Sequence, residues 1–68
     1  MKFSVQQFHT KIQSKGYENA GGGVWVRKVN GLPAAKWNVY TSDAPRADSF
    51  TKRGEEWHFV RCIALSNS

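Results

Sequence analysis

Residues 24–41 read VWVRKVNGLPAAKWNVYT, in which Asn30-Gly31 separates two runs of β-branched and aromatic residues. Asn-Gly between such runs is the strongest short-range signal for a β-hairpin, because both residues tolerate the positive φ values of a type I′ turn. The stretch therefore predicts two antiparallel strands joined at Asn30-Gly31. Pro33 has no N–H to give to a ladder, which favours an edge strand or a place inside the loop for it.

The two faces of this hairpin are expected to differ in chemistry. Side chains alternate between faces along a strand, and a two-residue loop places Trp25 opposite Lys36 and Val26 opposite Ala35. One face is then apolar and is expected to join the core; it carries Val24, Val26, Ala35, Trp37 and Val39. The other face is cationic, aromatic and amide-bearing; it carries Trp25, Arg27, Lys36, Asn38 and Tyr40.

Residues 4–15 are predicted to form a helix that precedes the hairpin. Ser4 and Gln7 have the spacing of a capping box, and Gly16 suits the left-handed position that follows a helix. Apolar residues recur at spacings of three and four, at Val5, Phe8 and Ile12. This stripe is narrow, so we expect the helix to lie on a sheet with only one side buried.

The remaining segments complete the expected fold class, which is α+β. Residues 18–23 are predicted to be a loop, 42–46 and 52–55 turns, and 49–51 a short strand. Residues 56–65 are rich in aromatic and β-branched types, which favours a strand, although their length and Glu-Glu start also suit a helix. The favoured architecture is one N-terminal helix packed on a small antiparallel sheet of three to four strands. The alternative is the order α-β-β-β-α with a C-terminal helix.

Size and charge limit the function classes. The chain has 68 residues, which predicts a single small basic domain over 1–68, and a net charge of +5. Residues 1–40 hold six Lys and Arg against one acid, which is the whole +5, whereas residues 41–68 hold four of each. Such a field attracts nucleic acid or an acidic protein surface. The polar first residues and the absence of a long apolar run predict a cytoplasmic protein, in a bacterial or host cell, with no membrane partner.

The residues that carry chemistry do not favour an enzyme. Cys62 and His58 are four apart, which on a strand separates them by about 13 Å. A lone Cys in an apolar run is usually a small core residue, and one Cys with two His lacks the paired spacing of a zinc site. We therefore expect no catalytic activity, no metal and no cofactor, and a buried Cys62.

The second hairpin face is the predicted binding site. Cations that contact phosphates, rings that stack on bases and an amide that reads a base edge are the parts of a nucleic-acid surface. The candidate residues are Trp25, Arg27, Lys28, Lys36, Asn38 and Tyr40. The alternative is a small inhibitor or adaptor, such as a phage-type antagonist, that docks on a protein partner in a nucleic-acid-processing complex. Trp, Tyr and Arg are also the residues that dominate protein–protein hot spots.

Overall fold

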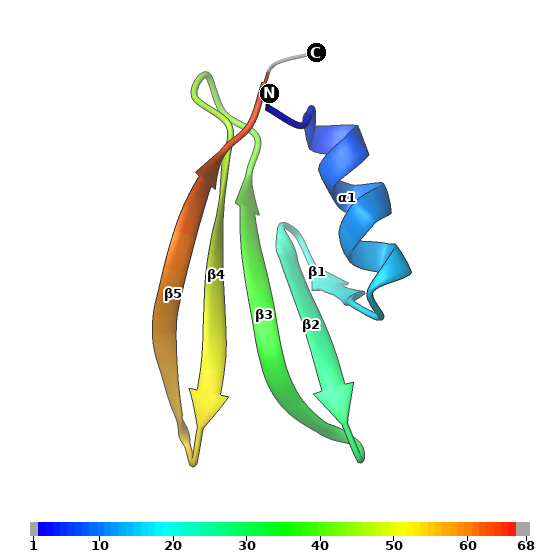
Figure 1. Ribbon diagram of the computed structural model, residues 1–68, viewed down its shortest axis with the longest axis vertical. Helices are drawn as coiled ribbons and strands as arrows, with labels where there is room; N and C mark the ends of the chain where they lie inside the picture. Colours follow the sequence, from blue (N-terminus) through cyan, green and yellow to red (C-terminus); the bar gives the residue numbers. More distant parts are fainter. Residues whose placement is uncertain (1, 67–68) are drawn as a thin grey trace.

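The computed structural model describes residues 2–66 and shows one helix and a five-stranded antiparallel sheet (Figure 1). The elements in chain order are α1 (Val5–Ser14), β1 (Glu18–Gly21), β2 (Val24–Val29), β3 (Leu32–Tyr40), β4 (Arg46–Arg53) and β5 (Glu56–Ala64). The strand order in the sheet is the chain order, so every strand pairs with its sequence neighbour. The α+β class is confirmed, and the expected three to four strands are corrected to five.

Local sequence signals explain both ends of α1. The Ser4 Oγ accepts a hydrogen bond from the Gln7 N–H at 3.1 Å, and the Gln7 Oε1 accepts one from the Ser4 N–H at 3.0 Å, which is the capping box. At the other end Gly16 has a φ of 92°, and the Tyr17 N–H bonds to the Ile12 carbonyl. These are the features of a Schellman ending, so the predicted helix boundaries are confirmed within one residue. Within residues 2–66, no helix is both long and apolar enough to cross a membrane.

The additional strand is β1, which lies where a loop was expected. It pairs with β2, and its four residues are all exposed. The side chain of Asn19 closes the turn that follows, because its Oδ1 accepts from the Gly21 N–H at 2.8 Å and its Nδ2 donates to the Gly22 carbonyl at 3.2 Å. A strand without a buried side has no alternating hydrophobic pattern, so the sequence did not predict β1.

The C-terminal segment is a strand, which settles the ambiguity over residues 56–65. β5 pairs with β4 from end to end except at Val60, which has no partner on β4, and Gly54, with a φ of 63°, lies in the turn between them. β4 is longer than the expected residues 49–51, and Arg46, Lys52 and Arg53 belong to it rather than to the expected turns. The sheet therefore ends on a long hairpin whose outer edge is β5.

The β2–β3 hairpin has the predicted turn but not the predicted register. Asn30 and Gly31 have φ values of 55° and 81°, as a type I′ turn requires. The pairing then shifts between Arg27 and Lys28, because Ala34 of β3 has no partner on β2 and forms a β-bulge. Beyond the bulge, Trp25 faces Trp37 rather than Lys36.

The bulge moves the side chains of β2 to the opposite face from the one expected. Val24 and Val26 are half-buried on the side away from α1, so their assignment to the core face is wrong. Trp25 is 7% exposed and belongs to the core. A single extra residue in one strand is enough for this exchange, because the side-chain period of a strand is two.

The core lies between α1 and one face of the sheet. Phe8 meets Trp37 edge-to-face with the ring centroids 4.9 Å apart, and His9 packs over Trp25 at 5.0 Å. The buried cluster draws on the helix, three strands and the segment after β5; it consists of Phe8, Ile12, Trp25, Trp37, Val39, Ala47 and Leu65. A helix of ten residues covers only part of this face, and no segment among residues 2–66 contributes a core to the other face.

Candidate nucleic-acid interface

The face of the sheet opposite α1, which we call the open face, carries a group of cationic and aromatic side chains. Alternation along each strand and the strand registers place on it residues from β2 to β5. Its cations are Lys28, Lys36, Arg46 and Lys52, and its aromatic residues are Tyr40, Phe50, Trp57 and Phe59. Among the described residues of β2 to β5, Asp48 is the one carboxylate on the open face, and its Oδ1 lies 3.6 Å from the Arg46 Nε.

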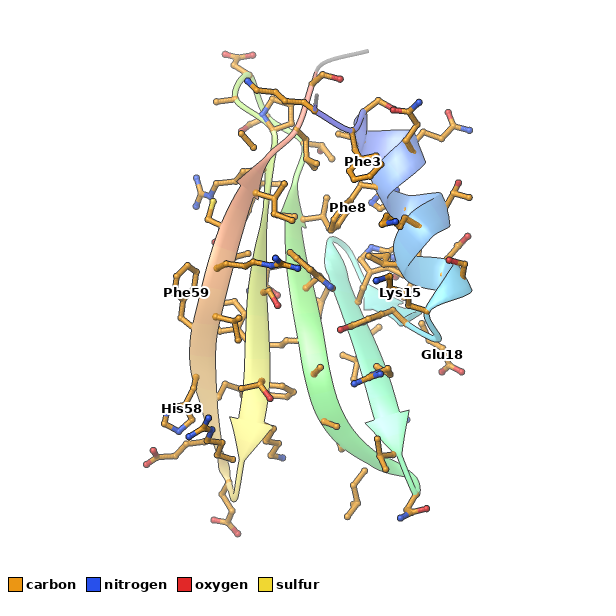
Figure 2. All side chains as sticks on the ribbon, viewed as in Figure 1. Phe3, Phe8, Lys15, Glu18, His58 and Phe59 are labelled. Carbon is orange, nitrogen blue, oxygen red and sulfur yellow. The ribbon has the colours of Figure 1, made fainter. Side chains whose placement is uncertain are left out.

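Three of the rings form one group, the aromatic cluster of Phe50, Trp57 and Phe59. Phe50 and Phe59 are cross-strand neighbours whose ring centroids are 5.7 Å apart in an edge-to-face arrangement. Phe59 is 60% exposed, and Figure 2 shows its ring projecting from β5 away from α1. An aromatic ring that leaves more than half of its surface in water is available to stack on a flat ligand.

Cations bracket this cluster. The Lys36 Nζ lies 4.6 Å from the ring centroid of Trp57 and 5.2 Å from that of Phe50, and the Lys52 Nζ lies 5.7 Å from Trp57. Cation–π attraction at these distances holds the ammonium groups beside the rings. No carboxylate of the described residues pairs with either lysine, so both charges are free for a ligand anion.

A second group lies farther along β3. The Arg46 Cζ is 4.4 Å from the Tyr40 ring centroid, and Tyr40 borders a shallow hollow of about 260 Å³. Asn38 lines the same hollow, and its Oδ1 is buried without a partner in the described part of the chain. Tyr40 and Lys36 are four residues apart on one strand, which separates the two groups by about 13 Å.

The structure unites some of the residues predicted from the sequence and separates others. Lys28, Lys36, Asn38 and Tyr40 share the open face. Trp25 and Arg27 point to the helix side instead: Trp25 is buried under His9, and the Arg27 Cζ lies 5.8 Å from the Tyr17 ring. The β-bulge at Ala34 is the physical reason for this split, since it turns β2 over relative to β3.

The aromatic cluster was missed at the sequence level, although a signal for it exists. Phe50 and Lys52 alternate with polar residues on β4, and Trp57 and Phe59 do so on β5. Placing a two-residue turn at Gly54 brings Lys52 opposite Trp57, as the structure has it. The prediction of a turn over residues 52–55 ended β4 too early, so the second cationic, aromatic hairpin was not predicted.

Cys62 also lies on the open face, and the expectation that it is buried is wrong. A hydrogen bond to the cross-strand carboxylate of Asp48 raises the pKa of the thiol; desolvation and the negative charge of Asp48 add to this, and Arg46 opposes it. The thiolate, which is the reactive form, is therefore disfavoured. Residues 2–66 contain no group of three His, Cys, Asp or Glu that could hold a metal ion.

Comparison of the chain with protein-family models, with curated proteins and with solved structures found no match. The interpretation of the open face therefore depends on its geometry and chemistry.

Proposed function

We propose that the protein binds single-stranded nucleic acid on the open face of its sheet. The observation that carries this proposal is the aromatic cluster with Lys36 and Lys52 beside it, uncovered by any segment of residues 2–66. Proteins that bind single strands combine rings for base stacking with cations that follow the backbone. Lys36 and Lys52 would meet phosphates, while Phe59 would stack on a base.

The shape of the open face favours a single strand over a duplex. Five strands spaced about 4.8 Å apart make a surface wider than the ~12 Å major groove of DNA. The two ring groups are about 13 Å apart, several times the 3.4 Å step between stacked bases. A base that stacks on Phe59 must offer a free face, and the bases inside a duplex have both faces covered by their neighbours, so splayed bases of a single strand suit this surface.

The hollow beside Tyr40 supports a second base position. Its volume of about 260 Å³ and its lining by Asn38 and Tyr40 suit one planar polar group. Arg46 beside the ring supplies a positive charge for the adjoining phosphate. The open face then holds two base positions joined by an extended backbone.

The proposal is tested by fluorescence anisotropy with labelled ten-nucleotide DNA and RNA oligomers, single- and double-stranded, at low and physiological salt. Phe59→Ala is expected to weaken single-strand binding by about 5- to 150-fold, the equivalent of ~1–3 kcal/mol for one stacked base. Lys36→Gln and Lys52→Gln are each expected to reduce the salt slope by about 0.7, the value for one phosphate of a single strand.

Two neighbours provide matched controls. Val60→Ala changes the adjoining apolar residue, which is 53% exposed against 60% for Phe59, and Arg53→Gln changes a cation whose side chain faces the helix side. Both variants are expected to bind like the parent. Absence of binding to every oligomer at low salt, or equal losses in the controls, would contradict the proposal.

Docking on a protein is the second candidate, and one observation favours it. Phe59 and Val60 are adjacent, 60% and 53% exposed, on the edge strand β5. Exposed apolar residues on an edge strand suit contact with another polypeptide. Binding to a protein through these residues would depend weakly on salt and would be lost in Val60→Ala. The nucleic-acid proposal instead expects Val60→Ala to leave oligomer binding unchanged.

A further inference from the structure

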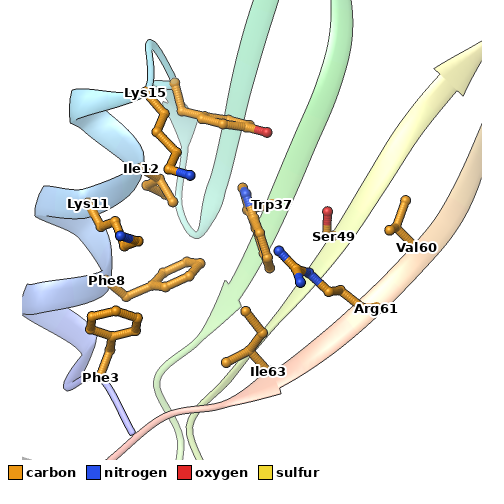
Figure 3. A pocket seen from close by; sticks show the side chains of 11 residues that line it. Phe3, Phe8, Lys11, Ile12, Lys15, Trp37, Ser49, Val60, Arg61 and Ile63 are labelled. Carbon is orange, nitrogen blue, oxygen red and sulfur yellow. The ribbon is translucent and has the colours of Figure 1, made fainter. Parts of the chain in front are cut away.

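A groove lies on the other side of the sheet, between α1 and the helix-facing residues of β4 and β5 (Figure 3). Its volume is about 370 Å³. Phe8, Trp37 and Ile63 form its apolar wall, and Ser49 adds a hydroxyl. The groove exists because α1 has only ten residues and leaves the β4–β5 part of this face uncovered.

Three cations surround this apolar wall. Lys11 lines the groove from α1, Lys15 from the cap just after the helix, and Arg61 from β5 with its Cζ 6.0 Å from the Trp37 ring centroid. No acidic residue is among the described residues that line it, and neither ion pair of residues 2–66 involves these three side chains. Cations gathered without a counter-charge repel one another, so an anion that binds between them gains their attraction and relieves that repulsion.

We propose that this groove is a second binding site, for a small aromatic molecule that carries an acidic group such as a phosphate. The flat ring would displace water from the accessible apolar lining, Phe3, Val60 and Ile63, above the buried Phe8 and Trp37. The acid would lie among Lys11, Lys15 and Arg61. The volume selects a small molecule, because ligand clefts of roughly 300–1,000 Å³ hold compounds of this size, whereas a protein partner needs about 800 Å² of contact surface.

The site is independent of the proposed nucleic-acid interface. The groove and the open face lie on opposite sides of the sheet and have no lining residue in common. Loss of oligomer binding in Phe59→Ala would leave the groove intact, and loss of ligand binding in the groove would leave the open face intact. An experiment that contradicts one of the two proposals therefore leaves the other standing.

The test uses 1-naphthyl phosphate with two partial probes, 1-naphthol for the ring alone and inorganic phosphate for the acid alone. Binding is followed by ¹H–¹⁵N NMR titration and by the rise of the thermal midpoint that accompanies ligand binding. We expect naphthyl phosphate to bind more tightly than either partial probe, with shifts in α1 and in β5 around Arg61.

Variants locate the contribution of each charge. Lys15→Gln and Arg61→Gln are each expected to weaken naphthyl phosphate binding by about two- to fivefold, as for the loss of one exposed ion pair, and to leave naphthol binding unchanged. Arg53→Gln, which lines neither the groove nor the open face, is the control and is expected to have no effect. Equal binding of naphthyl phosphate and naphthol, equal binding of naphthyl phosphate and inorganic phosphate, or shifts confined to Phe50 and Phe59 would overturn the proposal.

Discussion

Gly23 illustrates how much one position can determine in so small a sheet. Gly23 directly precedes β2, and its carbonyl accepts the Val39 N–H at 2.7 Å. A Cβ at Gly23 would overlap the carbonyl oxygen of Val39, and backbone at the central strand cannot move aside as a flexible side chain can. Glycine is therefore required here by close approach of two backbones, and its φ plays no part in the requirement.

Gly23→Ala is predicted to destabilise the fold by about 1–3 kcal/mol, the usual penalty of overpacking. The measurement is the free energy of unfolding in urea. Gly22→Asn is the matched control, because a side chain there meets nothing within 4 Å and Asn tolerates a φ of 55°. A Gly23→Ala variant as stable as Gly22→Asn would show that the two backbones are farther apart than the structure has them.

At the scale of elements, the sequence is informative wherever the signal is local. The capping box at Ser4, the Schellman ending at Gly16 and the turn at Asn30-Gly31 depend on residues within one turn of each other, and all three were predicted. The bulge at Ala34 has no such local signature, and it is the bulge that brings Trp25 opposite Trp37 and into the core. The sequence therefore yields two strands and a turn, but not which side of β2 is buried.

The same reason explains how much of the candidate site was predictable. Lys36, Asn38 and Tyr40 follow from alternation on β3 alone and lie together as expected. Their aromatic partners come from β4 and β5, whose contact with β3 depends on the register of the whole sheet. Pairwise placement across three strands is non-local information, and one misplaced turn was enough to hide it.

Trp37 and Trp57 lie on opposite faces of the sheet, so their substitution is predicted to cost very different amounts of stability. Trp37→Ala removes a buried ring that packs on Phe8 and is predicted to cost about 3–5 kcal/mol, comparable with the whole stability of a domain this small. Trp57→Ala, on the open face, is predicted to cost less than about 1.5 kcal/mol, because only part of its surface is buried. Thermal and urea unfolding of both variants measures the difference, with Trp37→Leu included in case Trp37→Ala does not fold. Equal losses at the two positions would contradict the assignment of faces.

At the scale of the whole molecule, one layer of core supports two surfaces of different character. The helix side closes the core around Trp25 and Trp37 and leaves a cationic groove, whereas the other side is an uncovered sheet. The meander joins neighbours in sequence, and its first and last described segments meet in a parallel bridge between Ser4 and Ser66. Because β3 lies at the centre of the sheet and contributes two residues to the core, we expect local stability to decrease from β3 towards both edges.

Amide hydrogen exchange should reveal this gradient. β3 is bonded on both sides and contributes Trp37 and Val39 to the core, so the Val39 amide is predicted to exchange only through global unfolding. β1 is a short edge strand with all four residues exposed, and Ala20 lies at a register shift without a partner on β2, so the Ala20 amide is predicted to exchange at a free energy of opening near zero. NMR-detected exchange at several urea concentrations separates the two routes, because only the global route depends steeply on denaturant. If Ala20 were as protected as Val39, the edge would be covered in solution, and association through β1 would have to be added to the description of this protein.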